Sequence, residues 1–280
     1  MGTAVPAPYW LLVGHPGPWP RKPIDAEPLT EVAGPLSKQL GRVGARLQLV
    51  RPHGRVEEAV REGRTPLPVF LVDVRRGLVG RSTWHSPEDL VELAGRFEDL
   101  PNPSEEPLFL VCTHGRKDVC CAISGRVVAA VLDDVLPGAV WETSHLGGDR
   151  FAGNVALLPE GSMYGRVDGD TAPRVVLDHL DGRVDLDRWR GRSSWHPAAQ
   201  VVVHRLLGED PRVRLADLPD PHVEVLADDV FRVTVQAPQG PFVRVVRRTM
   251  SEPHVLSCTG GPKAQALFAI EREQENTTTP

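Results

Sequence analysis

Cysteine is scarce in this chain, with only four among 280 residues. Disulfide scaffolds are typical of short secreted chains rich in cysteine, so the composition argues against one. Three of the four cysteines nevertheless fall within ten residues, in the segment VCTHGRKDVCCAISGR (111–126). A few thiols gathered in one segment favour metal binding or redox chemistry in a reducing compartment.

Long apolar runs and a secretory leader are also lacking. No stretch approaches the roughly 18 consecutive apolar residues of a membrane span, and the start MGTAVPAPYW has neither the basic nor the apolar region of a signal peptide. We therefore predict a soluble, cytoplasmic protein with no membrane partner. The formal net charge is −5 and the arginines are scattered, which argues against nucleic acid as a partner.

What the chain does have is enough length and apolar content, 41%, for two or three compact units. In residues 1–100 the apolar periodicity and the turn and cap residues predict the order β-α-β-β-β-α. The predicted elements are strands at 9–15 and 45–52, a helix at 29–44, a hairpin at 68–83 and a helix opened by Ser86. The proline-rich segment PNPSEEP (101–107) then predicts a linker.

The same order recurs in residues 105–190, so we predict a structural duplication with a period near 100 residues. Two unrelated α/β units are the alternative. The second set comprises strands at 108–112 and 139–145, helices at 125–136 and 171–180, and a hairpin at 154–168.

Residues 193–280 predict an appended α+β piece with a helix at 193–210, a hairpin formed by 222–236 and 241–249, and a polar tail at 271–280. The predicted fold class is therefore α/β (α+β), with units at 1–100 and 105–190 followed by the extension.

The candidate chemistry lies in two loops. Cys112 ends an apolar strand, and Cys121 follows after eight residues, near a helix N-terminus that stabilises anionic sulfur. The C-x-x-C spacing typical of zinc knuckles is absent. In SHLGGDRF (144–151), after the next strand, His145 and Asp149 bracket two glycines. Both loops can clamp one site.

The motifs CTHGRKDVCC and WETSHLGGDRFAGNVALLPEGSMYGRV, with WLLVGHPGPW at the start, resemble the sucrase/ferredoxin-like family. The stretch from His145 through MYGRV is also similar to the cluster-binding half of thioredoxin-like [2Fe–2S] ferredoxins. The resemblance implies two tandem thioredoxin-like units, the first without a cluster. In the histidine-containing branch it implies ligand pairs C-x8-C and H-x-G-G-H, which match Cys112, Cys121 and His145; Asp149 stands where the second histidine is expected.

The fourth ligand stays open among three residues. Asp149 has the expected position, although a carboxylate is a harder donor than thiolate or imidazole. Cys258 is a better donor chemically, but the C-terminal piece would have to fold over the site. Cys120 is either a ligand or a small buried hydrophobe beside one. Two neighbours can assist: His114 by donating to a cluster sulfur, and Glu142 by orienting His145.

These residues predict an electron carrier, not a catalyst, that passes single electrons from a reductase to an acceptor through a [2Fe–2S] cluster. An imidazole ligand raises the reduction potential and can couple it to pH. Two alternatives remain: a thiol–disulfide oxidoreductase using Cys120 and Cys121 or Cys112, and a structural zinc module on Cys112, Cys121, His145 and one more ligand. The oligomeric state is not indicated.

Overall fold

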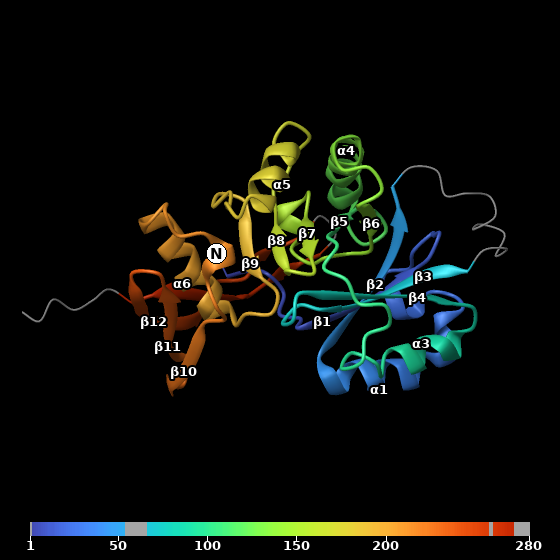
Figure 1. The fold of residues 1–280 in the computed structure, drawn as a ribbon, viewed down its shortest axis with the longest axis horizontal. Helices are drawn as coiled ribbons and strands as arrows, with labels where there is room; N and C mark the ends of the chain where they lie inside the picture. The colour runs from blue at the N-terminus through green and yellow to red at the C-terminus, as the bar shows by residue number, and fades with distance from the viewer. Residues whose placement is uncertain (1, 54–65, 258–259, 272–280) are drawn as a thin grey trace, which may run out of the picture.

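The computed structural model describes residues 2–53, 66–257 and 260–271. Its body is a mixed nine-stranded sheet with strand order β4-β3-β1-β2-β6-β5-β7-β8-β9 (Figure 1). The mixed α/β class predicted from the sequence is confirmed.

The first half of the sheet has a parallel pair, β1 and β2, and two antiparallel neighbours, β3 and β4. In the described residues of this half, helices α1 and α3 and the 3-10 turns η1 and η2 pack beside these strands. The elements are β1 (Tyr9–Gly14), η1 (Pro23–Asp25), η2 (Leu29–Val32), α1 (Ala33–Val43), β2 (Ala45–Pro52), β3 (Leu67–Asp73), β4 (Leu78–Trp84) and α3 (Pro87–Leu93). The elements predicted for this half are confirmed, including the helix opened by Ser86, where Ser86 and Asp89 form a capping box.

The second half repeats this succession: β5 and β6 are parallel, and β7 and β8 follow antiparallel. Its elements are β5 (Leu108–Cys112), α4 (Val119–Val135), β6 (Val140–Thr143), η3 (Asp149–Phe151), β7 (Val155–Leu158), β8 (Ser162–Tyr164), α5 (Ala172–Leu180) and β9 (Trp189–Arg192). Strands β2 and β6 pair antiparallel and join the two halves into one sheet.

The described residues form three hydrophobic cores. One lies between the first half-sheet and α1 and α3, and another between the second half-sheet and α4, α5 and α6. Figure 1 shows α1 and α3 on one side of the sheet and α4 and α5 on the opposite side. The third core joins the inner faces of the halves, where Trp10 and Phe70 share a cluster with Leu110. Cys112 and Cys121 belong to this middle core, so both thiols are shielded from water.

The C-terminal piece departs from its predicted boundaries. The predicted strand 222–236 is broken by a turn, where Asp229 has a φ of 62°. The helix begins at Pro197, with the His196 ring nitrogen as its cap. The elements are α6 (Pro197–Glu209), η4 (Leu215–Asp217), β10 (His222–Ala227), β11 (Val230–Ala237), β12 (Gly240–Met250), β13 (His254–Val255), β14 (Pro262–Lys263) and β15 (Ala266–Ile270).

Strands β10, β11, β12 and β15 form a separate four-stranded sheet packed on α6. The predicted frayed tail lies outside the described residues from position 272 on. In the described part of the chain, no helix combines the length and apolar character needed to cross a membrane.

Candidate metal centre

Cys112 is the last residue of β5, in the middle of the large sheet. Its backbone N–H donates to the Asn154 carbonyl at 3.0 Å, and its register partner on β6 is Thr143. The strand ends here because the following segment leaves the sheet to reach α4. Cys112 is fully buried, at 0% exposure.

Helix α4 brings the second thiol to this strand end. The sequence predicted a helix only from Gly125, but α4 begins at Val119 because the Asp118 carboxylate accepts a hydrogen bond from the Cys120 N–H at 3.1 Å. Cys121 therefore lies in the first helical turn and not in a loop, and it is fully buried as well. The sequence did contain the signal, since an aspartate directly before an apolar run is a common N-cap.

A glycine allows α4 to approach β5 this closely. A Cβ on Gly125 would lie 2.0 Å from the Cys112 carbonyl oxygen. Both groups belong to the backbone of regular elements, so neither can move aside cheaply. The separation of the two thiols thus depends on a residue without a side chain.

We expect Gly125→Ala to lower the free energy of unfolding by about 3 kcal/mol, because the added methyl group overpacks the contact between α4 and Cys112. Urea denaturation measures the change. Gly41→Ala in α1 is the matched control: nothing lies within 4 Å of the position that its methyl group would take, so it should be neutral or stabilising. Equal midpoints for the two variants would contradict the close packing at Cys112.

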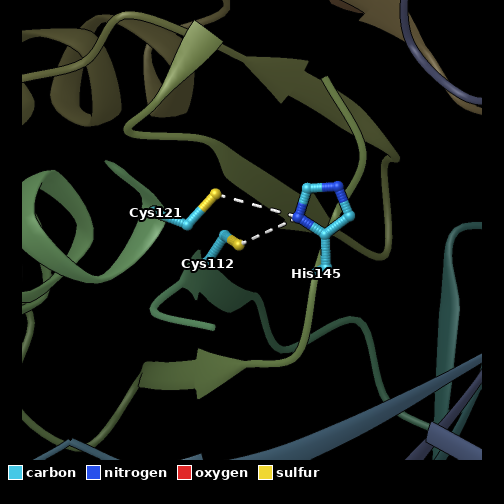
Figure 2. Close-up of side chains that lie close together, drawn as sticks. All are labelled: Cys112, Cys121 and His145. Carbon is cyan, nitrogen blue, oxygen red and sulfur yellow. Dashed lines mark hydrogen bonds between the residues drawn. The ribbon is translucent and has the colours of Figure 1, made fainter. Parts of the chain in front are cut away.

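His145 follows β6 and points its ring toward both thiols (Figure 2). Its Nδ1 lies 3.8 Å from the Sγ of Cys112 and 3.8 Å from the Sγ of Cys121. The three ligand atoms all lie within 4.8 Å of one another. The structure thus brings together three of the predicted site residues.

The backbone of His145 is fixed from several sides. Its carbonyl accepts hydrogen bonds from Arg46 Nη2 at 2.9 Å and Gln48 Nε2 at 3.3 Å. Its N–H donates to His114 Nδ1 at 3.2 Å. His114 was considered as a donor to cluster sulfur; in the structure it is buried and its ring supports the His145 backbone. Arg46 and Gln48 lie nearly 100 positions away in sequence, and no local motif marked them.

The electrostatics of the site favour anionic sulfur. The contact with the Cys121 side chain lowers the pKa of Cys112 well below its ordinary value; burial opposes this shift, and His145 adds to it. Burial lowers the pKa of His114, which keeps that imidazole neutral near neutral pH. Thiolate and imidazole together form a donor set suited to zinc or to iron–sulfur clusters.

Two buried nitrogens around the site have no hydrogen-bond partner among the described residues: Arg46 Nη1 and His114 Nε2. Buried donors are normally satisfied, so each such case needs an explanation. A bound anionic centre would explain why Arg46, a cation, has an N–H donor without a hydrogen-bond partner near the site. The donor set and the open guanidinium therefore fit a metal centre.

The three candidates for a fourth ligand have different outcomes. Cys120 is half-buried and disulfide-bonded, whereas Cys112 and Cys121 form no disulfide. The backbone of Asp149 opens η3, but its side chain, like all of Cys258, lies outside the described part of the structure. Asp149 and Cys258 as ligands therefore stay predictions.

His145 also lines a pocket of about 480 Å³. Its walls come from the N-terminal residues 2–6, from the loop that carries Gly148 and Arg150, and from C-terminal residues including Lys263 and Gln265. Arg150 hydrogen-bonds to Gln265. The C-terminal piece therefore does return to the site, as ligation by Cys258 would require.

The two glycines after His145 adopt a backbone conformation that favours glycine and lie beside a buried arginine. Gly147 and Gly148 both have left-handed φ values, 84° and 81°. A Cβ on Gly148 would lie 2.7 Å from Arg190 Nη2. The missing side chain of Gly148 thus leaves room for the buried Arg190. The Nη1 of Arg190 donates a hydrogen bond to the Gly147 carbonyl at 2.9 Å.

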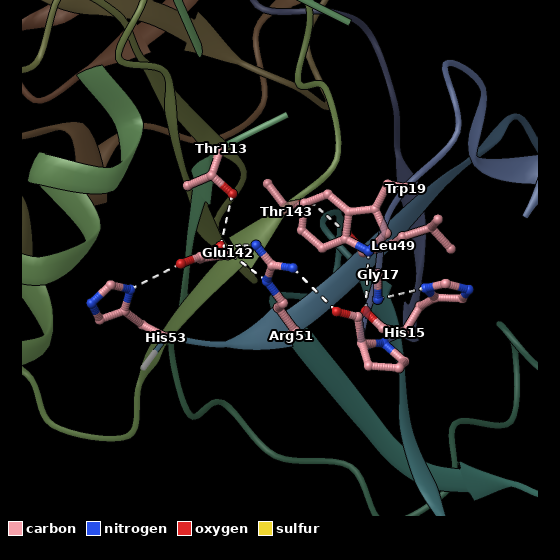
Figure 3. A network of polar contacts seen from close by, with 10 residues as sticks. His15, Gly17, Trp19, Leu49, Arg51, His53, Thr113, Glu142 and Thr143 are labelled. Carbon is pink, nitrogen blue, oxygen red and sulfur yellow. Dashed lines mark hydrogen bonds and ion pairs between the residues drawn. The ribbon is translucent and has the colours of Figure 1, made fainter. Parts of the chain in front are cut away.

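Glu142 does not contact the His145 ring through any hydrogen bond or ion pair found in the described residues. Its carboxylate is bound instead by Arg51 at 2.6 Å, by His53 at 3.1 Å and by the Thr113 hydroxyl at 3.0 Å (Figure 3). Burial acts to raise the pKa of Glu142, but the hydrogen bonds and charge of Arg51 outweigh it and hold that pKa below its usual value. This network ties the residue after Cys112 to β2 and β6.

We expect Glu142→Gln to lower the free energy of unfolding by about 2 kcal/mol at neutral pH, because Arg51 loses a largely buried countercharge. The carboxylate contributes fully above its unfolded pKa, and the contribution is lost as pH falls through the lower folded pKa. The variant should therefore lose less stability than wild type on acidification, measured by urea denaturation from pH 7 to 3. Glu106→Gln, whose partner Arg81 forms an exposed pair, should change little. An unchanged acid slope in Glu142→Gln would contradict this role.

Geometry and donor set define the class of site, a buried cysteine–histidine centre suited to a metal, at a strand end of a mixed α/β protein. The family model of the sucrase/ferredoxin-like proteins matches residues 1–191, so the chain belongs to the sucrase/ferredoxin-like family. The family resemblance read from the motifs is thereby confirmed.

A further comparison finds similarity to a protein named "Altered inheritance of mitochondria protein 32" from Meyerozyma guilliermondii, with 31% identity over 97 residues. The match covers 31% of this chain and 34% of that protein, so it spans only about a third of either. No solved structure matches the chain.

Proposed function

We propose that the protein is a one-electron carrier with a [2Fe–2S] cluster held by Cys112, Cys121, His145 and Asp149. The cluster would belong to the second of two tandem thioredoxin-like units, an assignment supported by the repeated strand succession in the two half-sheets. The observation that carries the proposal is the meeting of two buried thiols with one imidazole nitrogen, all within 4.8 Å.

The bound cluster would supply reversible one-electron chemistry. The chain's own residues provide the surroundings. The middle core excludes water from both sulfurs, and the backbone contacts of Arg46 and His114 hold His145 in place. His145 also lines a pocket, which offers a route of close approach for redox partners. A reductase would donate one electron, and an acceptor protein would remove the same electron.

The decisive experiment is to purify the protein from iron-replete cells and to measure iron, acid-labile sulfide, zinc and visible absorption. We expect two irons and two sulfides per chain, as the formula requires, and bleaching of the visible bands by one electron per chain. A colourless protein without iron and sulfide would refute the proposal.

A structural zinc site is the second candidate, because one distance favours it. Tetrahedral zinc, with bonds of about 2.3 Å to sulfur and 2.0–2.1 Å to nitrogen, places those two ligand atoms about 3.6 Å apart. The observed Nδ1–Sγ separations of 3.8 Å are close to this value. Ligands on the two different irons of a cluster lie further apart, so loading would require His145 to shift outward. One zinc per chain, with no redox activity, would establish this alternative.

We keep the cytoplasm as the proposed location. The name of the partial relative refers to the inheritance of mitochondria, and the match covers only a third of that protein. Imaging the tagged full chain, or fractionating cells that contain it, would test the location.

A further inference from the structure

Arg46, the second residue of β2, holds its guanidinium against the loop that carries His145. Its Nη2 donates to the His145 carbonyl at 2.9 Å. Its guanidinium carbon lies 5.0 Å from the centroid of the Trp10 ring, within the range of a cation–π contact. The residue as a whole is half-buried, but its Nη1 is shielded from solvent and has no partner among the described residues.

The charge of Arg46 is not balanced by a carboxylate in any ion pair of the described chain. Arg51, on the same strand, shows the contrast, because it binds the carboxylate of Glu142 at 2.6 Å. Among the described groups, the Cys112 sulfur acts through its negative charge to raise the pKa of Arg46. Burial lowers the pKa of Arg46 to about 10, which still leaves the guanidinium charged at neutral pH.

Even a partly buried cation is costly when its shielded N–H groups face no countercharge, and a nearby opposite charge offsets that cost. The two thiols of the centre supply that charge when they are deprotonated. Each electron added to such a centre makes it one unit more negative, so a fixed neighbouring cation stabilises the reduced state more than the oxidised state. Because both sulfurs lie in the middle core, this interaction is screened less than one between two exposed charges.

We propose that Arg46 is a positioning and charge-balancing residue of the metal centre, which holds the backbone of His145 and raises the affinity of the bound centre for its electron. This inference rests on the proposed one-electron function. It predicts that the guanidinium acts on the potential through its charge and on the centre's geometry through the His145 carbonyl. An effect on folding alone would leave the potential unchanged.

The test compares Arg46→Gln and Arg46→Lys with wild type, each purified with its cluster, by redox titration followed in the visible spectrum. Arg46→Gln should lower the equilibrium constant for reduction at least tenfold, which for one electron equals about 59 mV. Arg46→Lys, which keeps the charge, should retain most of the wild-type potential even if less cluster is loaded. Arg150→Gln is the matched control. That arginine lies on the same loop region but is exposed, so its removal should change the constant less than threefold.

The outcomes separate the two proposals. Wild-type protein without iron and sulfide would overturn the proposed function, and the assignment of Arg46 with it. Arg46→Gln protein with wild-type iron, sulfide and potential would overturn the assignment of Arg46 alone. If Arg46→Gln proves insoluble, an Arg46→Lys potential shifted as far as tenfold would also overturn it, because the charge is then still present.

Discussion

Replacing Cys112 by serine is expected to remove the metal centre. Serine offers a hard and weakly acidic oxygen where a soft thiolate donor is needed, and the site is too buried for water to take its place. Mutating a group that only hydrogen-bonds to a metal ligand usually lowers metal affinity tenfold to hundredfold. Loss of a ligand itself should lower the affinity at least as much. We therefore expect metal content to fall to roughly a tenth of wild type or less, measured by elemental analysis and sulfide assay. Cys121→Ser should behave in the same way.

Cys120→Ser provides the matched control, since Cys120 is adjacent to Cys121 but is disulfide-bonded. It should keep its metal and its spectrum. Equal loss of metal in Cys112→Ser and Cys120→Ser would mean that substitution in this segment acts through folding and not through ligation. Full metal content in Cys112→Ser would exclude Cys112 as a ligand.

Whether a contact in this site can be predicted depends on how far apart its two residues lie in the sequence. Cys112 and Cys121 lie at adjoining ends of a strand and a helix, and a short local motif predicts that they meet. His145 follows the neighbouring parallel strand, and the ends of parallel strands lie at the same edge of a sheet. Arg46 comes from the first half of the chain and reaches His145 only because β2 pairs with β6. Periodicity in either half does not predict that pairing.

The fold shows the same limit. Local apolar patterns predict most strands and helices of the two halves, but not how β2 and β6 join them into one sheet. The predicted strand 222–236 was wrong for a local reason: alternation on either side drew attention from the break at Asp228 and Asp229, two consecutive acidic residues where the chain turns and Asp229 has a positive φ.

Replacing His145 by cysteine should keep a metal-binding donor but lower the reduction potential. A thiolate carries a negative charge where neutral imidazole carries none, so it makes addition of an electron less favourable. Centres with two histidines lie several hundred millivolts above all-cysteine plant-type ferredoxins, so a single exchange should lower the potential by about 100 mV or more. Redox titration of the loaded protein, with iron and sulfide measured on the same samples, gives the shift.

The spectrum and the potential together distinguish ligation by His145 from a histidine that is merely nearby. Exchanging a ligand alters both the donor set and the net charge of the bound centre, so His145→Cys should change the visible bands as well as the potential. His85→Cys, which places a thiol at an exposed position, should keep the wild-type spectrum and potential. If His145→Cys retains both as well, the imidazole lies beside the centre without binding it.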